Sequence, residues 1–291
     1  MAQIREIKKR IGAVGTIARI TKTMQMIATA KFTAAGQRAS ASKPYAGMID
    51  EMVRQVATKA EEYSSILIDG PVEKTGKELL LVIASDRGLC GAYNANVLRL
   101  ALGETRRDDV DTGIEVAGKK GMGFFRFQKI EVLQQHAIGD TPAYEDVEAI
   151  ANKYLERYMS GEFDAIKVCS MRYYSTSRQA AEVTQLLPLA MPEGEDAPKA
   201  KSGEAEPVYE FTPSAGELLD ELLPTTVRTL LFQLFNEAAV AEHVMRMIAM
   251  KAATENAKEF GRTLKRDFNR ARQGMITTEL MEVISGAAAL E

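Results

Sequence analysis

The sequence predicts an α/β protein in which a central domain with a mostly parallel sheet lies between two long terminal helices that form an antiparallel coiled coil. Residues 1–57 and 212–291 carry apolar side chains at helical spacing and contain few prolines. Residues 58–211 instead alternate short apolar runs with helical patterns, which is typical of strands joined by crossover helices. We therefore expect an N-terminal helix (1–57), a globular α/β domain (58–211) and a C-terminal helix (212–291).

The N-terminal helix shows two apolar stripes at heptad steps. The first stripe consists of Ile4, Ile7, Ile11 and Val14, and the second of Ile17, Ile20, Met24 and Ile27. Since heptad spacing keeps a stripe on one face of a helix, we expect this segment to pack along a second long helix.

The C-terminal segment opens with Thr212-Pro213, a helix N-cap followed by proline at the first helical position. Pro224 predicts a kink or a restart of the helix. Beyond it, apolar residues recur at steps of three and four: Ala257, Phe260, Leu264, Phe268, Ala271 and Met275. At about 1.5 Å per residue, a helix over 225–288 is on the order of 95 Å long. A compact domain needs no helix of that length, whereas a shaft or a coiled coil does.

Antiparallel pairing also predicts a register. If the globular domain holds residues 57 and 213 level, paired positions add to roughly 270, since both helices rise equally. Met24 then lies opposite Arg246, and the helix beyond Asn269 has no partner within the chain. Its apolar residues predict a tip that is housed by another protein.

The middle of the chain reads as an α/β domain. Apolar runs predict strands at 79–84, 114–117, 165–169 and 182–189, with helices near 94–106, 118–125 and 144–159. Residues 192–207 read as a mobile acidic surface loop and 208–211 as an edge strand. The turns at 85–91 and 118–121 lack the order of residues found in phosphate-binding loops, so their glycines fit tight strand-to-helix turns.

Composition limits the chemistry. The chain has 291 residues with a net charge of −3, and no apolar run approaches the roughly 20 residues of a membrane span. Its two cysteines, Cys90 and Cys169, suggest a reducing compartment, and its two histidines are too few for a metal cluster. Cys90 reads as a packed thiol rather than a nucleophile. We therefore expect no catalytic, cofactor-binding or metal-binding residues in this chain.

Charge is segregated along the sequence, with basic helices at both ends and an acidic middle. Basic helices favour acidic partners, either protein surfaces or nucleic acid. In the turn after the first strand, Asp86 and Arg87 either form a local ion pair or face a partner at the edge of the sheet.

Several longer motifs now coincide, and together they resemble the gamma subunit of F-type ATP synthases over the whole chain. They are Ile20-Thr21-Lys22-Thr23-Met24-Gln25-Met26-Ile27-Ala28, Ser85-Asp86-Arg87-Gly88-Leu89-Cys90-Gly91, Thr184-Gln185-Leu186-Leu187-Pro188-Leu189, Arg246-Met247-Ile248-Ala249-Met250-Lys251-Ala252-Ala253-Thr254 and Ala271-Arg272-Gln273-Gly274-Met275-Ile276-Thr277. The bacterial form fits best, because the helical pattern begins at residues 2–4 without a leader. The chloroplast form's redox insert with its cysteine pair is missing from this sequence.

The resemblance implies a non-catalytic central-stalk rotor with a Rossmann-like domain. Its implied partners are three alpha and three beta subunits, the epsilon subunit and the membrane c-ring, with no nucleic acid and no cofactor. Its implied location is the cytoplasmic face of the bacterial inner membrane, as a peripheral subunit.

The resemblance also implies three groups of contact residues. Met24, Arg246, Gln273 and Thr277 are implied to act in rotor–stator coupling. Asp86, Arg87 and Cys90 lie in a loop that the family places near an acidic lever of beta. The apolar shaft tip is Met275, Ile276, Leu280, Val283 and Ile284.

Two alternatives remain open at the level of sequence. A nucleotide-binding enzyme built on the α/β domain predicts ATP affinity in the isolated chain that changes at Gly88 or Gly91. A nucleic-acid-associated coiled coil predicts salt-dependent DNA binding by the purified chain.

Overall fold

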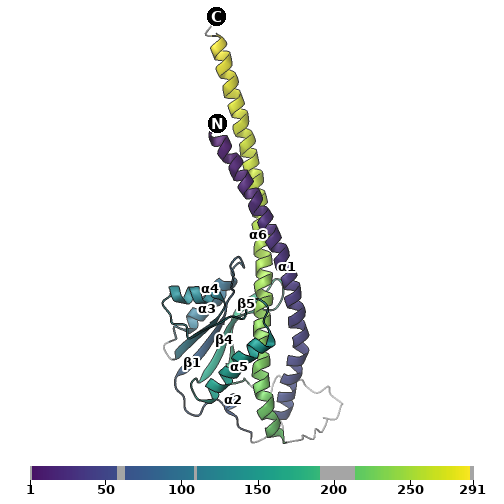
Figure 1. Ribbon diagram of the computed structural model, residues 1–291, viewed down its shortest axis with the longest axis vertical. Helices are drawn as coiled ribbons and strands as arrows, with labels where there is room; N and C mark the ends of the chain where they lie inside the picture. The colour runs from purple at the N-terminus through teal and green to yellow at the C-terminus, as the bar shows by residue number, and fades with distance from the viewer. Residues whose placement is uncertain (1, 58–62, 108–109, 191–213, 289–291) are drawn as a thin grey trace. The chain divides into compact units, whose positions relative to one another are not determined.

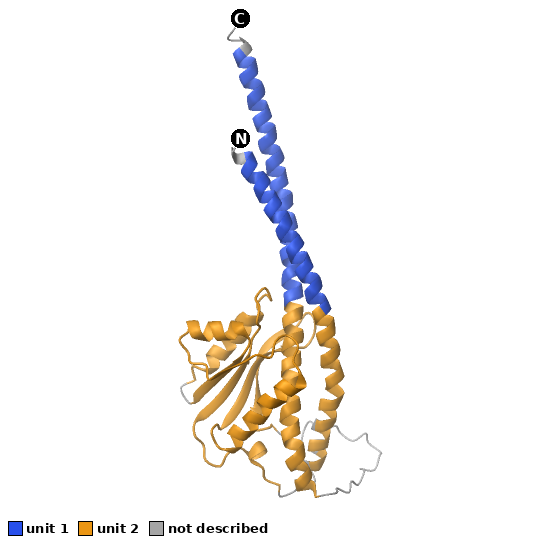
Figure 2. Cartoon of the chain, in the orientation of Figure 1, with its two compact units in different colours: residues 1–30, 246–291 blue, residues 31–245 orange. Residues whose placement is uncertain are grey.

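The computed structural model describes residues 2–57, 63–107, 110–190 and 214–288 (Figure 1). The chain forms two compact units, residues 1–30 with 246–291 as unit 1 and residues 31–245 as unit 2 (Figure 2). Two long helices, α1 (Ala2–Ala57) and α6 (Ala215–Ala288), each contribute to both units. The predicted fold class is confirmed. In chain order, one long helix precedes and another follows the segments that form a mostly parallel five-stranded sheet.

Unit 1 is an antiparallel pair formed by the first part of α1 and the last part of α6 (Figure 2). Its contact surface repeats at steps of three and four on both helices. On α1 the repeating positions, all of them buried or half-buried, are Ile4, Ile7, Ile11, Val14, Ala18, Thr21, Gln25 and Ala28. On α6 they are Met250, Thr254, Ala257, Gly261, Leu264, Phe268, Ala271 and Met275. This spacing is that of an antiparallel coiled coil.

Three of the four residues in the second predicted stripe of α1 lie outside this contact surface, whereas Met24 is half-buried next to Gln25. Ile17, Ile20 and Ile27 are 51%, 53% and 53% exposed. The contact surface instead continues at heptad spacing from Val14 through Ala18. Its further positions carry small or polar residues, so a pattern of large apolar side chains does not reveal them. We call Ile17, Ile20, Met24 and Ile27 the outward stripe.

On α6, too, a small residue occupies a contact position at which the sequence pattern predicted a large one. Phe260 is 54% exposed, although its spacing predicted a contact position. Gly261 takes that position, and a Cβ atom built there would lie 3.7 Å from Cγ1 of Val14. Small residues let the two helix backbones approach closely, so the contact surface contains them where a sequence pattern favours phenylalanine.

The predicted register of the helix pair is wrong. The Thr254 hydroxyl donates to the Thr21 hydroxyl at 2.8 Å, whereas the predicted register places residue 249 opposite Thr21. Contact of Gly261 with Val14 follows the same shifted register. The prediction assumed that the inner ends of the two helices are level, which no residue pattern required. Met24 consequently lies opposite a position near Lys251 instead of Arg246.

Unit 2 is built on a five-stranded sheet with the order β3-β2-β1-β4-β5. The strands are β1 (Lys77–Ile83), β2 (Asp111–Ala117), β3 (Gln134–His136), β4 (Ala165–Tyr173) and β5 (Gln179–Leu187). All neighbouring pairs are parallel except β4 with β5, which is antiparallel. The sequence analysis did not predict β3, because three polar residues give no apolar pattern.

Helices cover both faces of this sheet (Figure 1). The helices are α2 (Ile66–Asp69), α3 (Tyr93–Glu104), α4 (Lys119–Phe127) and α5 (Tyr144–Met159), besides α1 and α6. In β1, Leu79, Leu81 and Ile83 belong to the core shared with α1, α5 and α6. Leu80 and Val82 belong to the core on the other face, with α3 and α4. Burial on both faces explains why β1 reads as one continuous apolar run.

Pro224 lies inside α6 and does not end it, so of the predicted kink or restart the restart is wrong, and the kink stays a prediction. α6 continues through Pro224, and Leu219, Leu223 and Val227 around it are fully buried. An internal proline costs a helix about 3 kcal/mol, while each buried leucine contributes roughly 1.5–3 kcal/mol, so packing outweighs the lost hydrogen bond. The helix begins after Ser214, whose hydroxyl accepts from the amide of Glu217 at 3.4 Å. The predicted cap at 212–213, acidic loop and edge strand lie outside the described residues.

Candidate functional site

The loop after β1 occupies the carboxyl end of the parallel sheet, where binding loops of α/β domains gather. A buried polar cluster fixes its conformation. The Ser85 amide donates to the Asn94 side-chain oxygen at 3.0 Å, and the Ser85 hydroxyl donates to the Arg87 carbonyl at 2.7 Å. Asn94 also donates to the sulfur of Cys90 at 3.2 Å. These hydrogen bonds from Ser85 and Asn94 therefore fix the conformation of the loop.

Of the three residues predicted to face a partner here, two are exposed. The side chains of Asp86 and Arg87 lie on the surface, whereas Cys90 is only 2% exposed and packs in the core with α3. The sequence analysis gave no role to Leu89, which is 60% exposed. The outward-facing side chains of this loop are thus Asp86, Arg87 and Leu89.

Asp86 has a structural partner within the chain. Its carboxylate accepts from the amide of Lys119 at 3.0 Å, the first residue of α4. The N-terminus of a helix attracts an anion, and in a nucleotide-binding domain that anion is a phosphate. Here a side chain of the neighbouring loop takes the place, which agrees with the prediction that the glycine turns serve tight packing.

Gly118 shows why that turn needs glycine. Its φ is +100°, and a Cβ atom would lie 2.1 Å from the Ala84 carbonyl oxygen. The backbone of the turn after β2 therefore lies directly against the end of β1. This close approach brings Lys119 within reach of Asp86.

The predicted coupling residues of unit 1 occupy different positions along the helix pair. Met24 is half-buried on the outward stripe of α1, and Arg246 is half-buried at the start of the unit's α6 segment. Gln273 and Thr277 are exposed one helical turn apart, and the Thr277 hydroxyl donates to the Gln273 carbonyl at 3.0 Å. The structure therefore brings Gln273 and Thr277 together but leaves Met24 and Arg246 out of register.

The end of α6 exposes the predicted apolar tip. Met275 is half-buried, whereas the other four residues of the predicted tip are exposed over more than half of their surface. Their exposed fractions are 54% for Ile276, 57% for Leu280, 71% for Val283 and 53% for Ile284. A helix end this apolar is typical of a surface that another protein covers.

Next to the tip, α6 carries a concentrated positive charge. Its exposed side chains border a shallow hollow of about 460 Å³, lined by Arg262, Lys265, Arg266, Asn269, Arg270 and Gln273. Four cations on two helical turns favour an acidic partner surface.

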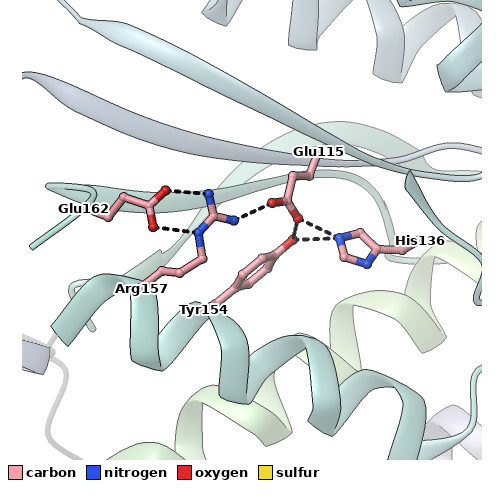
Figure 3. Close-up of polar contacts among 5 residues, drawn as sticks. All are labelled: Glu115, His136, Tyr154, Arg157 and Glu162. Carbon is pink, nitrogen blue, oxygen red and sulfur yellow. Dashed lines mark hydrogen bonds and ion pairs between the residues drawn. The ribbon is translucent and has the colours of Figure 1, made fainter. Parts of the chain in front are cut away.

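Unit 2 also contains a buried polar network that the sequence analysis did not identify (Figure 3). Glu115 on β2 is 1% exposed and accepts from Tyr154 at 2.8 Å and from Arg157 at 2.6 Å. His136 on β3 lies 2.6 Å from the same carboxylate. Arg157 also makes a two-pronged ion pair with Glu162, at 2.9 and 2.8 Å. The network ties the short edge strand β3 to β2 and to α5.

The electrostatics of this network favour an ionised Glu115. Burial alone raises the pKa of Glu115, but hydrogen bonds from His136, Tyr154 and Arg157 outweigh burial and hold the pKa below its usual value. Burial and the adjacent Glu115 carboxylate raise the pKa of Tyr154 well above 10. Glu115 and His136 are both closed to solvent, so the centre of the network offers no access to a substrate, and its contacts join β2, β3 and α5.

A cluster of metal-binding type is not found among the described residues. None of the described helices combines the length and the apolar character that a bilayer span requires.

Comparison with known proteins agrees with this architecture. The profile of a family described as "ATP synthase" matches residues 3–290. Proteins named ATP synthase gamma chain match over the full length of both chains, with 40% identity in Rhodopirellula baltica, 36% in Leptospira biflexa and 37% in Glaesserella parasuis.

Solved structures give the same fold at lower identity. A chain of the Euglena gracilis mitochondrial ATP synthase matches with a TM-score of 0.65 and 18% identity, over 99% of this chain and 95% of that chain. A chain from the central stalk and c-ring of the Tetrahymena thermophila enzyme matches with a TM-score of 0.57 and 18% identity, over 80% and 99%. On this evidence, the chain belongs to the ATP synthase gamma-chain family.

Proposed function

We propose that this chain is the central-stalk rotor of an F-type ATP synthase, which couples rotation of a membrane c-ring to conformational cycling of the catalytic beta subunits. Full-length identity of 36–40% to ATP synthase gamma chains carries the proposal. Its partners would be three alpha and three beta subunits, an epsilon subunit and the c-ring. Its place would be peripheral, at the cytoplasmic face of the bacterial inner membrane.

The continuity of the long helices supports a role in transmitting torque. α6 runs without a break for 74 residues and contributes to both units, and α1 does so for 56 residues. Twisting force applied to unit 2 is then carried to unit 1 along two hydrogen-bonded helices rather than through a flexible linker.

The side chains on the surface of unit 1 support the proposal that a stator surrounds this unit. The outward stripe, the apolar tip and the basic hollow together present apolar and positive side chains to the outside. A sleeve made by alpha and beta subunits would cover the tip, and acidic segments of that sleeve would meet the cations. Met24, Arg246, Gln273 and Thr277 are proposed as coupling contacts within this surface.

We further propose that the chain itself makes and breaks no bond. The Asp86 carboxylate occupies the helix N-terminus at which a nucleotide phosphate would bind, and Glu115, at the centre of the polar network, is closed to solvent. Nucleotide chemistry would then belong to the beta subunits.

Expression with and without partner subunits tests the proposal. A tagged chain is expected to co-purify with alpha, beta and epsilon in a complex that hydrolyses ATP, while the pure chain hydrolyses none. ATP turnover by the pure chain would favour the enzyme alternative. Salt-dependent DNA binding without alpha and beta would favour the nucleic-acid alternative.

A further inference from the structure

Unit 2 contains a cavity between α1, α6 and the end of β5. Its volume is about 550 Å³, within the range of about 300–1,000 Å³ that is usual for small-molecule sites. Helix α1 contributes the small residues Ala46 and Gly47 to its lining, and these leave room between the two long helices. Strand β5 contributes Thr184 and Gln185, which belong to a sequence motif that the proposed rotor function does not explain.

A second, smaller cavity of about 290 Å³ adjoins the first. Ala46, Thr229 and Gln233 line both cavities, whereas Tyr144 and Phe232 line only the smaller one. A ligand in the larger cavity would therefore meet Thr229 at the border between the two.

Thr229 is a buried residue whose hydroxyl is left unpaired. It is 7% exposed, and its hydroxyl has no hydrogen-bond partner within the described part of the chain. The preceding threonines of α6 differ, because the Thr225 hydroxyl donates to the Glu221 carbonyl at 3.1 Å and the Thr226 hydroxyl to the Leu222 carbonyl at 2.9 Å. A buried hydroxyl without a partner is unfavourable. Since threonine has two side-chain rotamers available within a helix, a ligand oxygen at this border would supply the missing partner.

The rest of the larger cavity combines an apolar wall with one charge. Ile49, Val53 and Leu189 line it and are buried members of the core. Among the described residues that line the cavity, Lys43 alone is charged, and its side chain is exposed. An apolar wall beside a single cation fits a ligand with an apolar body and one negative charge.

We propose that this cavity binds an amphipathic carboxylate of the medium-chain fatty-acid class. Its chain would pack against Ile49, Val53 and Leu189, and its carboxylate would accept hydrogen bonds from the Thr229 hydroxyl and the Lys43 ammonium. A ligand held by α1 and α6 together would stabilise their packing within unit 2. Such a site goes beyond the proposed rotor function and does not depend on it, because its lining comes from this chain.

Titration of the purified full chain with octanoate tests the site. Calorimetry is expected to show saturable binding of one octanoate per chain, and octanoate should raise the melting temperature. Ala46→Leu fills the border between the cavities and should abolish binding without lowering the melting temperature. Ala34→Leu makes the same exchange on an exposed face of α1 and should leave binding unchanged. Absence of saturable binding to the wild-type chain, or equal binding to the Ala46→Leu variant, would overturn the proposal.

Two threonine variants test the hydrogen bond separately. Thr229→Val removes the unpaired hydroxyl, so the melting temperature of the free chain should stay the same or rise, while octanoate binding should weaken roughly tenfold. Thr226→Val is the matched control, because Thr226 lines the same cavity but its hydroxyl is bonded within α6. Octanoate affinity should stay at the wild-type value in that control. An unchanged affinity in Thr229→Val would contradict the assigned contact.

Octanol, the uncharged analogue, tests the role of the charge. Lys43→Gln should weaken octanoate binding about fivefold, as expected for loss of an exposed ion pair, and should leave octanol binding unchanged. An equal effect on both ligands, or on neither, would refute the pairing of Lys43 with a carboxylate.

Discussion

A single carboxylate, Glu115, holds three elements of unit 2 together. Its folded pKa lies below its usual value of 4.5, so the ionised form stabilises the fold above that pH and loses its contribution as the pH falls through the folded pKa. We expect Glu115→Gln to lower the free energy of unfolding by about 3 kcal/mol at neutral pH, because Arg157 loses a buried partner. In denaturant titrations, the difference from wild type should shrink as the pH falls below 4.5 and through the folded pKa.

Glu162→Gln is the matched control for that experiment. Glu162 binds the same arginine, but its side chain is 47% exposed, and exposed ion pairs contribute about 1 kcal/mol or less. Equal losses in the two variants would contradict the assignment of Glu115 as the centre of the network.

Gly118, before α4, and Gly123, inside α4, should respond in opposite directions to alanine. Gly118→Ala places a Cβ atom 2.1 Å from a carbonyl oxygen at φ +100°, and we expect it to destabilise the chain by roughly 3 kcal/mol or more. At Gly123, which lies inside α4, an added Cβ atom would meet no other atom within 4 Å. Gly123→Ala should therefore stabilise the helix by about 0.5–1 kcal/mol. Thermal unfolding of both variants checks this, and a stable Gly118→Ala would refute the close approach.

Sequence patterns at the residue scale identified single residues but not their partners. His136 is buried, with its ring nitrogen 2.6 Å from the Glu115 carboxylate. The parallel pairing of β2 with β3 brings Glu115 to His136, and packing of α5 brings Tyr154 to both. Three polar residues in β3 gave no signal for that pairing.

At the scale of helices, cysteine pairs test the register of unit 1. The hydroxyls of Thr21 and Thr254 are 2.8 Å apart, so the two side chains point toward each other across the helix pair. Thr21→Cys with Thr254→Cys should therefore cross-link rapidly under mild oxidation, seen as a mobility shift that reducing agent reverses. Met24→Cys with Arg246→Cys should not. Cross-linking of the second pair alone would restore the register predicted from the sequence.

The outward stripe of α1 is expected to serve coupling rather than folding. Met24→Lys leaves the contact surface of unit 1 intact, so assembly and ATP hydrolysis should be retained. The new cation would bind stator carboxylates in some rotary positions. Each such contact contributes about 1.5–3 kcal/mol, and the rotor must break it during every turn. The pumping-to-hydrolysis ratio in vesicles should fall, while Thr23→Lys, exposed beside the stripe, leaves it near wild type. No change in Met24→Lys would assign Met24 to ordinary helix packing.

Helical spacing predicted both long helices but not which stripe packs. Two heptad stripes on α1 were equally apolar, and the one that packs continues through Ala18, Thr21 and Gln25. Periodicity records where large apolar residues recur, whereas close helix contact selects small ones. A coupling surface is apolar for reasons of partner binding, so sequence alone could not separate it from the contact surface.

At the scale of the whole molecule, the fold class followed from the alternation of apolar runs and helical patterns between two long helices. The β1 run, buried on both faces, was readily predicted. The antiparallel direction of β5 was not, because strand direction depends on the connection from Tyr173 to Gln179 rather than on the strand's own residues. Asp86 could be predicted as a loop residue, but its use as a cap for α4 depends on the sheet order.

Rotation is the property that most directly tests the role of this chain. Val72 is fully exposed, so Val72→Cys offers an attachment site for a bead while alpha and beta subunits are fixed to a surface. With ATP present, the bead is expected to turn continuously in one direction, and to stop when ATP is removed. ATP hydrolysis by the fixed complex with a bead that does not turn would contradict the assignment of this chain as the rotor.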